Sequence, residues 1–274
     1  MEHLIWNIDP VLISFAGLSI HWYGALFATA ILGGLQVMKW IYQQEKLNIE
    51  ALDTLLVYAV FGIIIGARLG HCLFYDPEYY LNNPIKILAI WEGGLASHGG
   101  GLGVIIATAL YAKKHQVNLL WLLDRLAIAT ALFGFFVRAA NFVNSEILGV
   151  PSQVSWAIVF QRIDNIPRHP VQLYEAFSYL LIFVVLIAIY KASNKTPSRK
   201  EKKSTQDNVV ETHGRYLGTF LILVFTARFI IEFFKEKQAV YAADFAISTG
   251  QMLSLPFFIV GIVLVVRAMR SNNV

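Results

Sequence analysis

The segment VRAANFVNSEILG, residues 137–149, places Arg138, Asn141, Asn144 and Glu146 at the end of a long apolar run. An arginine stays charged even where water is scarce, and its planar guanidinium binds phosphate oxygens through two parallel hydrogen bonds. Inserting an ionisable group into a membrane costs about 2.5–3.5 kcal/mol, so such groups usually pair with one another or serve a function. The segment is therefore a candidate site for an anionic ligand.

Two further arginines lie within or beside apolar runs. Arg228 stands four residues before Glu232, so both occupy one face of a helix. They would form either a structural ion pair or part of the same polar site. Arg68 stands three residues before His71, so these two residues share one face of another helix. The sequence does not decide its role, and we favour a structural role over a catalytic one.

The segment EGGLASHGGGLG, residues 92–103, surrounds His98 with glycines. A glycine inside a helix costs about 1 kcal/mol relative to alanine, so this density has a reason. The glycines would either let two helices pack closely or expose backbone amides to an anion at a helix start. We interpret His98 as a proton-transfer group, with a structural histidine as the alternative.

The composition is typical of a membrane protein. Hydrophobic residues make up 57% and charged residues 15% of the 274, with a mean hydropathy of +0.57. A soluble domain carries about a quarter charged residues. The single cysteine, Cys72, lies in an apolar run and is interpreted as a small buried hydrophobe. No segment resembling a cleaved leader precedes the first long run, so we expect that run to be retained as a span.

Seven runs approach the roughly 20 residues that a helix needs to cross a bilayer. They cover residues 17–40, 52–74, 94–112, 119–137, 173–190, 217–234 and 248–266. We therefore expect an all-α, polytopic integral membrane protein with about seven transmembrane helices in a single domain, residues 1–274.

Lysine and arginine distribution predicts the orientation of these spans. One set of flanks carries thirteen of the 22 basic residues and the opposite set six, with three inside or at the edge of spans. The richer side should be cytoplasmic. The N-terminus is then outside and the C-terminus inside.

Two connecting segments stand out. Residues 138–172 should form an extracytoplasmic loop or small head, in which VSWAIVF, residues 154–160, alternates like a short strand. Residues 191–216 are polar and basic and should form a flexible cytoplasmic loop.

With this topology, Tyr23, His98, Arg138 and Arg228 all fall near the outer leaflet, and the inner halves of the spans are mostly apolar. Two classes of function fit such a layer. One is an enzyme acting on an anionic lipid, and the other is a transporter or channel for a small anion. A transporter needs polar lining on both sides of its site, so the apolar inner halves favour the enzyme.

The motifs also resemble a known family. The pattern R-x-A-N-F-x-N-x-E-x-x-G at residues 138–149 resembles the signature of bacterial prolipoprotein diacylglyceryl transferases, in which Val137 replaces the usual glycine. Five other segments resemble the family in order and spacing. They are HWYG at 21–24, GAR at 66–68, SHGGGLG at 97–103, RHPVQLYEA at 168–176 and ARFIIEFFKE at 227–236. Only residues 191–215 or so fall outside the resemblance.

The resemblance implies the reaction. Such enzymes transfer the diacylglyceryl group of phosphatidylglycerol to the lipobox cysteine in the signal peptide of a prolipoprotein, forming a thioether and releasing glycerol phosphate. This would be the first step of lipoprotein maturation, in the bacterial cytoplasmic (inner) membrane with the active site toward the outer leaflet. We expect phosphatidylglycerol, the prolipoprotein and membrane lipids as partners, with no cofactor, no metal and no nucleic acid.

The resemblance also implies residue roles. Arg138 would bind the lipid phosphate, and with Arg228 it would stabilise the leaving group. His98 would be the general base that produces the nucleophilic thiolate, or else a phosphate ligand. Asn141 and Glu146 would hold Arg138 or the glycerol hydroxyls. The residues expected to bind phosphatidylglycerol are Tyr23, Arg138, Asn141, Glu146, Arg228 and Glu232.

Overall fold

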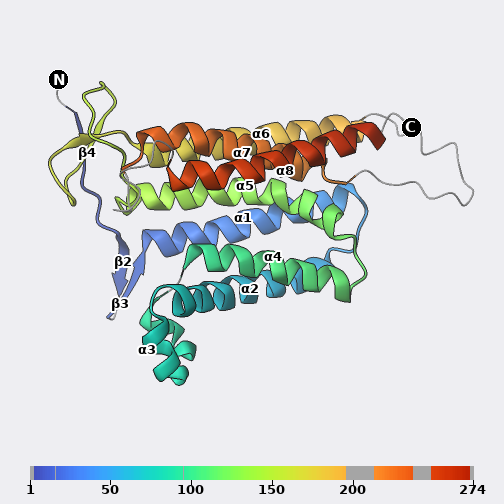
Figure 1. Ribbon diagram of the computed structural model, residues 1–274, viewed down its shortest axis with the longest axis horizontal. Coiled ribbons are helices and arrows are strands. Elements are labelled where there is room, and N and C mark those ends of the chain that lie inside the picture. The colour runs from blue at the N-terminus through green and yellow to red at the C-terminus, as the bar shows by residue number, and fades with distance from the viewer. Residues whose placement is uncertain (1–2, 16, 95, 196–212, 237–247, 272–274) are drawn as a thin grey trace, which may run out of the picture. The chain divides into compact units, whose positions relative to one another are not determined.

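The computed structural model describes residues 3–15, 17–94, 96–195, 213–236 and 248–271 (Figure 1). Most of the described chain is helical. The helices are α1 Trp22–Gln44, α2 Glu50–Phe74, α3 Pro77–Asn82, η1 Pro84–Leu88, η2 Ile90–Glu92, α4 Ser97–Lys114, α5 Leu119–Val143, α6 Val171–Lys195, α7 Arg215–Ile231, η4 Glu232–Phe234 and α8 Thr249–Ser271. The strands are β1 Leu4–Trp6, β2 Val11–Phe15, β3 Leu18–His21, β4 Ile158–Phe160 and β5 Pro167–Arg168.

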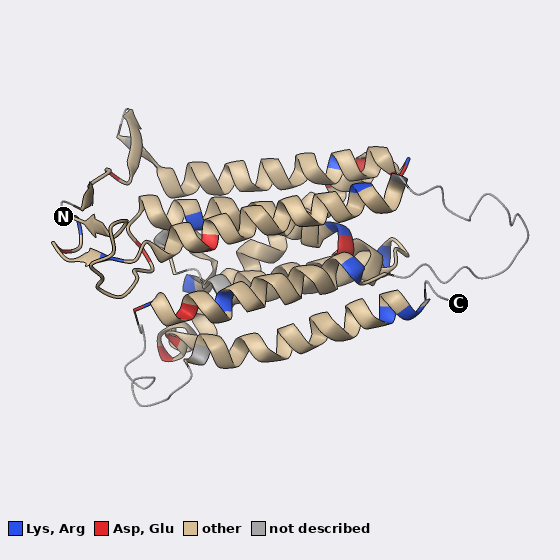
Figure 2. Ribbon diagram, turned by 90° about the horizontal axis from the view of Figure 1, so that it is seen from above, with Lys and Arg blue, Asp and Glu red and all other residues tan. Residues whose placement is uncertain are grey.

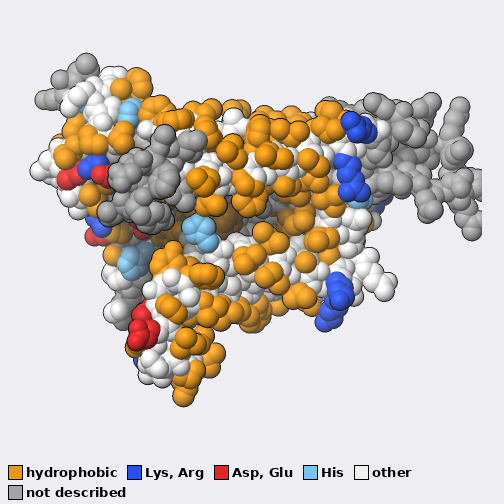
Figure 3. All heavy atoms as spheres, viewed as in Figure 1, with side chains coloured by type: hydrophobic (Ala, Val, Ile, Leu, Met, Phe, Trp, Pro, Cys, Tyr) orange, Lys and Arg blue, Asp and Glu red, His pale blue; other side chains and the backbone are white. Residues whose placement is uncertain are grey.

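Six of the described helices are long and apolar enough to cross a membrane, namely α1, α2, α5, α6, α7 and α8. Their charged residues gather toward the helix ends, leaving long uncharged stretches between (Figure 2). Hydrophobic side chains cover much of the helical surface (Figure 3). On α6, Phe177 and Leu181 are each 64% exposed, as expected for side chains that face lipid rather than water. The chain is a polytopic membrane protein.

The third expected span is the exception. Residues 94–112 were expected to cross the membrane, and the structure has a helix there, α4, with 18 residues. It is not among the six because its glycines and its terminal Lys113 and Lys114 lower its hydropathy. A seventh span and the orientation of the termini therefore stay predictions.

Two expected boundaries are wrong. The first span was expected from residue 17, but β2 Val11–Phe15 and β3 Leu18–His21 pair as an antiparallel hairpin, and α1 begins only at Trp22. Gly17, with a φ of +82°, lies in the turn of this hairpin. The fourth span was expected to end at Val137, but α5 continues to Val143, because Ala139 and Ala140 favour a helix. Arg138 and Asn141 are therefore helical residues.

Contacts divide the chain into two compact units, each described by itself. The first comprises Met1–Val37 and Asp124–Val274, and the second comprises Met38–Leu123. In the first unit, the buried carboxylate of Asp124 on α5 accepts hydrogen bonds from the backbone amides of Gly214 and Leu217, at 2.6 and 2.8 Å. These amides open α7 and would otherwise lack partners, so Asp124 fixes the start of that helix.

The first unit also carries a small sheet of order β1-β4-β5. Strand β1 runs parallel to β4 with Leu4 opposite Ile158, and β4 runs antiparallel to β5. Strand β4 coincides with the second half of the VSWAIVF segment, so the strand expected there is confirmed in part. Phe142, at the end of α5, packs against the Ile158 and Phe160 side chains of β4. The sheet thus holds the end of α5 in place.

The expected basic loop at residues 191–216 lies largely outside the described residues. At its edges, Lys191–Lys195 continue α6 and Arg215 begins α7.

In the second unit, α2 and α4 pack through glycines. Gly62, Gly66 and Gly70 recur every four residues on α2 and face Gly99 and Gly103 of α4. A Cβ atom built on Gly103 would overlap the backbone of Gly62 and Gly66. Such small-residue faces let two helix backbones approach closely in a membrane. Of the two readings of the glycine-rich segment, close helix packing is confirmed for Gly99 and Gly103.

We expect Gly103→Ala to destabilise the protein by about 1–3 kcal/mol, since the added methyl group has backbone on the opposite side and cannot be accommodated by side-chain motion. Gly101→Ala is the matched control, because nothing lies within 4 Å of its Cβ position and alanine is the better helix former. Thermal unfolding of both variants in detergent measures the difference. Equal midpoints would contradict the packing explanation.

Candidate functional site

The signature residues form one cluster in the first unit. From the last turns of α5, Arg138 donates through Nη1 to Asn141 Oδ1 at 3.3 Å. Asn141 in turn donates through Nδ2 to Glu146 Oε2 at 2.9 Å. Tyr23, at the start of α1, lies beside Asn141 and within electrostatic reach of Arg138 and Glu146. The structure therefore brings together four of the residues selected from the sequence.

The loop that carries Glu146 is strained and held from several sides. Ser145 and Ile147 have φ values of 57° and 55°, a conformation that is costly for a β-branched residue, by about 1–3 kcal/mol. Gln172, at the start of α6, donates to the Glu146 carbonyl at 2.6 Å. The Glu236 amide donates to the Leu148 carbonyl at 3.1 Å. These hydrogen bonds hold the exposed Glu146 side chain beside Asn141 and Asn144.

A buried glutamate connects Arg138 to a second cation. Glu175 on α6 is 4% exposed, and its Oε2 lies 3.0 Å from Arg138 Nε. Its other oxygen, Oε1, lies 2.6 Å from Lys235 Nζ. Lys235 also lies 3.5 Å from Glu232 Oε2. One carboxylate thus orients two cations, one on α5 and one just after η4.

Glu232 ends this network at the start of α8. Ser248 Oγ donates to Glu232 Oε1 at 3.0 Å. Gly250, in the first turn of α8, leaves room for the carboxylate, because any Cβ there would overlap it. A carboxylate is favoured at a helix N-terminus by the helix dipole. Of the two alternatives for Arg228 and Glu232, the structural ion pair is not found among the described residues, where Glu232 contacts Lys235 and Ser248.

Arg228 faces a cavity between α6 and α7. The cavity is lined by Glu175, Ser178, Tyr179, Ile182, Val224, Ala227, Arg228 and Ile231. Among the described residues, no carboxylate lies within 4 Å of the Arg228 guanidinium. Tyr179 lies within electrostatic reach of both Arg228 and Arg138 and hydrogen-bonds to Arg138. Arg228 therefore lines the cavity directly, and Arg138 contacts two of its lining residues, Glu175 and Tyr179.

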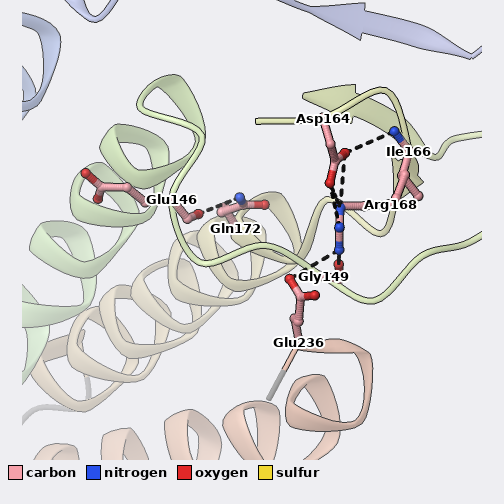
Figure 4. Close-up of polar contacts among 7 residues, drawn as sticks. All are labelled: Glu146, Gly149, Asp164, Ile166, Arg168, Gln172 and Glu236. Carbon is pink, nitrogen blue, oxygen red and sulfur yellow. Dashed lines mark hydrogen bonds and ion pairs between the residues drawn. The ribbon is translucent and has the colours of Figure 1, made fainter. Parts of the chain in front are cut away.

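Arg168 makes a separate junction beside this site (Figure 4). Its buried guanidinium lies 2.6 Å from Asp164 Oδ2 and 3.2 Å from Glu236 Oε2, and it also donates to the Gly149 carbonyl at 3.3 Å. The hydrogen bond from Arg168 lowers the pKa of Asp164 below its usual value and raises that of Arg168. Arg168 thus joins the head, the signature loop and the segment after α7.

His98 belongs to the second unit. It is the second residue of α4, its side chain is exposed, and among the described residues no hydrogen bond or ion pair to its ring is found.

Arg68 is in the same unit, 3% exposed, and hydrogen-bonded to backbone carbonyls. Cys72 is buried and free, as expected. Among the described residues, no group of three histidine, cysteine, aspartate or glutamate side chains could hold a metal ion.

The sequence did not single out three residues of the network as site residues. Glu175, Tyr179 and Lys235 had only indirect signals. Glu175 opens an apolar run, Lys235 counted only as a basic flank, and Tyr179 resembles any aromatic residue in a span. Tyr179 fits because Gly134 on α5 leaves space for its ring. Only packing between helices reveals such a contact.

Comparison with known proteins now identifies the family. A model described as prolipoprotein diacylglyceryl transferase matches residues 10–267. The chain belongs to this family. Relatives named phosphatidylglycerol–prolipoprotein diacylglyceryl transferase include one from Tolumonas auensis, 54% identical over 98% of this chain and 99% of the relative. Others come from Chloroherpeton thalassium, 41% identical over 98% and 96%, and Bacteroides fragilis, 43% identical over 94% and 92%.

Membership in the prolipoprotein diacylglyceryl transferase family confirms the resemblance read from the motifs. The match extends across both units, from before β2 to near the end of α8. It does not support the alternative of an anion transporter or channel. The clustered Arg138, Asn141 and Glu146 are therefore features of a family member.

We expect Glu175→Gln to destabilise the protein by about 2–4 kcal/mol, because it leaves the partly buried Arg138 and Lys235 with less countercharge. Glu175→Gln combined with Lys235→Met should recover part of this loss, since one surplus cation is removed. Thermal unfolding of the single and double variants in detergent tests the coupling. Glu236→Gln is the control, because that carboxylate is half exposed and its ion pair should contribute about 1 kcal/mol or less. Additive effects of the two changes would contradict the shared network.

Proposed function

We propose that this protein transfers the diacylglyceryl group of phosphatidylglycerol to the lipobox cysteine of prolipoproteins, as the first step of lipoprotein maturation. The names of its relatives give this activity, and the family match covers nearly the whole chain. The observation in the structure that carries the proposal is the cavity lined by Arg228 and by Glu175, the carboxylate that pairs with Arg138. It offers positive charge beside apolar lining, which suits an anionic lipid.

The lipid phosphate binds between the two arginines. Arg138 pairs with Glu175 through Nε, donates to Asn141 through Nη1 and also hydrogen-bonds to Tyr179. These partners use three of the five N–H donors of a guanidinium, so donors remain for the ligand. Arg228 has no carboxylate partner among the described residues, so an anion would balance its charge. Ile182, Val224 and Ile231 give the same cavity an apolar wall beside Arg228.

The glycerol head of the lipid is uncharged and carries two hydroxyls. The exposed Glu146, with Asn141 and Asn144 at 2.9 and 3.1 Å, offers polar groups for them. Tyr23 lies at the edge of this cluster. The Glu232 carboxylate contacts Lys235 and accepts a hydrogen bond from Ser248 at the start of α8. Glu232 therefore contributes to lipid binding indirectly, by positioning Lys235.

The chemical step is a displacement at carbon. The cysteine thiol loses its proton, and the thiolate sulfur forms a bond to the terminal glyceryl carbon. The bond between that carbon and the phosphate oxygen breaks, and glycerol phosphate leaves with both electrons of the bond. Charge grows on the leaving phosphate, where Arg138 and Arg228 stabilise it more strongly than they stabilise the bound lipid. We propose that His98 is the general base that accepts the proton from the thiol.

The reaction takes place at the outer leaflet of the cytoplasmic membrane. Both substrates are amphipathic, and both carry their reacting atoms near the head-group region. The polar cluster fits that depth, because its residues lie toward one end of α5, α6 and α7 and the cavity continues into apolar lining.

The purified protein in detergent, with phosphatidylglycerol and a synthetic lipobox peptide, tests the activity directly. We expect release of glycerol phosphate together with a peptide mass gain equal to one diacylglyceryl group. A peptide with serine in place of cysteine should give neither product. A folded protein that yields neither product with the cysteine peptide would overturn the proposal.

We expect Arg138→Ala and Arg228→Ala each to lower kcat/KM by about 100-fold or more, the size of effect seen when one stabilising donor is removed from a transition state. Thermal unfolding establishes whether each variant is folded. The control is Arg162→Ala, because this exposed arginine lies in the head outside the cluster. Normal turnover in either cavity variant would contradict binding of the phosphate between the two arginines.

A further inference from the structure

Arg68 is a buried cation whose partners among the described residues are uncharged. Its Nε donates to the Ile87 carbonyl at 2.8 Å, and Nη2 donates to the Lys86 carbonyl. Its Nη1 donates to the carbonyls of Gly93 and Gly94. The guanidinium also lies over the Tyr80 ring, 5.0 Å from its centre. All of the Arg68 contacts go to the segment that precedes α4.

The fork of the guanidinium joins two places in that segment. One edge holds η1 at residues 86 and 87, and the other holds residues 93 and 94, which come just before α4. Gly93 and Gly94 have φ values of +87° and +72°, and a Cβ on Gly94 would overlap Arg68 and His71. The Ala96 amide also donates to the Ala67 carbonyl at 2.9 Å. The Arg68 side chain and the Ala67 carbonyl thus fix the backbone before α4 to α2.

His98 comes two residues after Ala96. Its ring has no hydrogen bond or ion pair to a described residue that would orient it. Its position therefore depends on the backbone of the first turn of α4, and that turn begins where Arg68 holds the chain.

We propose that Arg68 is a positioning residue for His98: it fixes the backbone before α4 and so places the imidazole for reaction with the thiol. This rests on the proposed role of His98 as the base. A lysine cannot replace Arg68, because one ammonium group cannot reach both sets of carbonyls in the geometry of the fork. The structural role favoured from the sequence therefore has a catalytic consequence.

A double-mutant cycle tests the proposal by activity. Arg68→Lys should lower kcat about 10- to 100-fold, the effect of small displacements of a reacting group, with KM for phosphatidylglycerol within about 2-fold of its normal value. In a His98→Asn background, the same change should alter kcat by less than about 2-fold, since its effect acts through His98. Equal losses in both backgrounds, or full activity of Arg68→Lys, would overturn the proposal.

Gly94→Ala provides a second variant that disturbs the same carbonyls while keeping Arg68. It should show the same loss and the same dependence on His98. The matched control is Arg162→Lys, which should retain normal kcat and KM.

A distance measurement distinguishes failure of this inference from failure of the role of His98. Spin labels at His98→Cys and Val57→Cys, with Cys72→Ser, report the position of residue 98 relative to an exposed residue of α2. Arg68→Lys should broaden or shift the distance distribution, and an unchanged distribution would overturn the positioning role. If His98→Asn is fully active while Arg68→Lys still changes the distances, the role of His98 as base falls and the anchoring by Arg68 stands.

Discussion

The site depends on one buried carboxylate between two cations. Glu175 receives Arg138 on one oxygen and Lys235 on the other, at 3.0 and 2.6 Å. A buried charge is tolerated only when it is paired, so these groups stabilise one another. Because they come from α5, from α6 and from the segment after α7, the same network that satisfies the charges also joins the helices. Arg228 lines the cavity next to Glu175 and has no carboxylate within 4 Å among the described residues, which is why we propose it as a ligand-binding cation.

Packing details place the members of this network. Gly134 leaves room for the Tyr179 ring, and Gly250 leaves room for the Glu232 carboxylate. At the other end of α7, Asp124 satisfies the first amides of the helix. The position of Arg228 along α7 is therefore fixed from both ends. Each of these contacts uses a polar or small residue where a membrane helix would otherwise carry a larger apolar one.

The second unit also relies on small residues and on a buried cation, but there they position the backbone before α4. Its α2 and α4 approach through facing glycines, and Arg68 donates to the backbone carbonyls of residues 86, 87, 93 and 94. Backbone groups in a membrane protein require partners, and a buried arginine requires acceptors. The two requirements are met together in the loop before α4, which leads directly to His98.

The sequence by itself determined the membrane class, the existence of the long helices, and the family through its motifs. It also selected Arg138, Asn141, Glu146 and Tyr23, because an amphipathic pattern and local spacing carry that information. Only the tertiary structure decided the pairing: Glu232 contacts Lys235 rather than Arg228, and Glu175 joins two cations. Such contacts lie between helices distant in sequence, where helical period gives no register. The ends of α1 and α5 likewise depend on the hairpin and sheet packed against them.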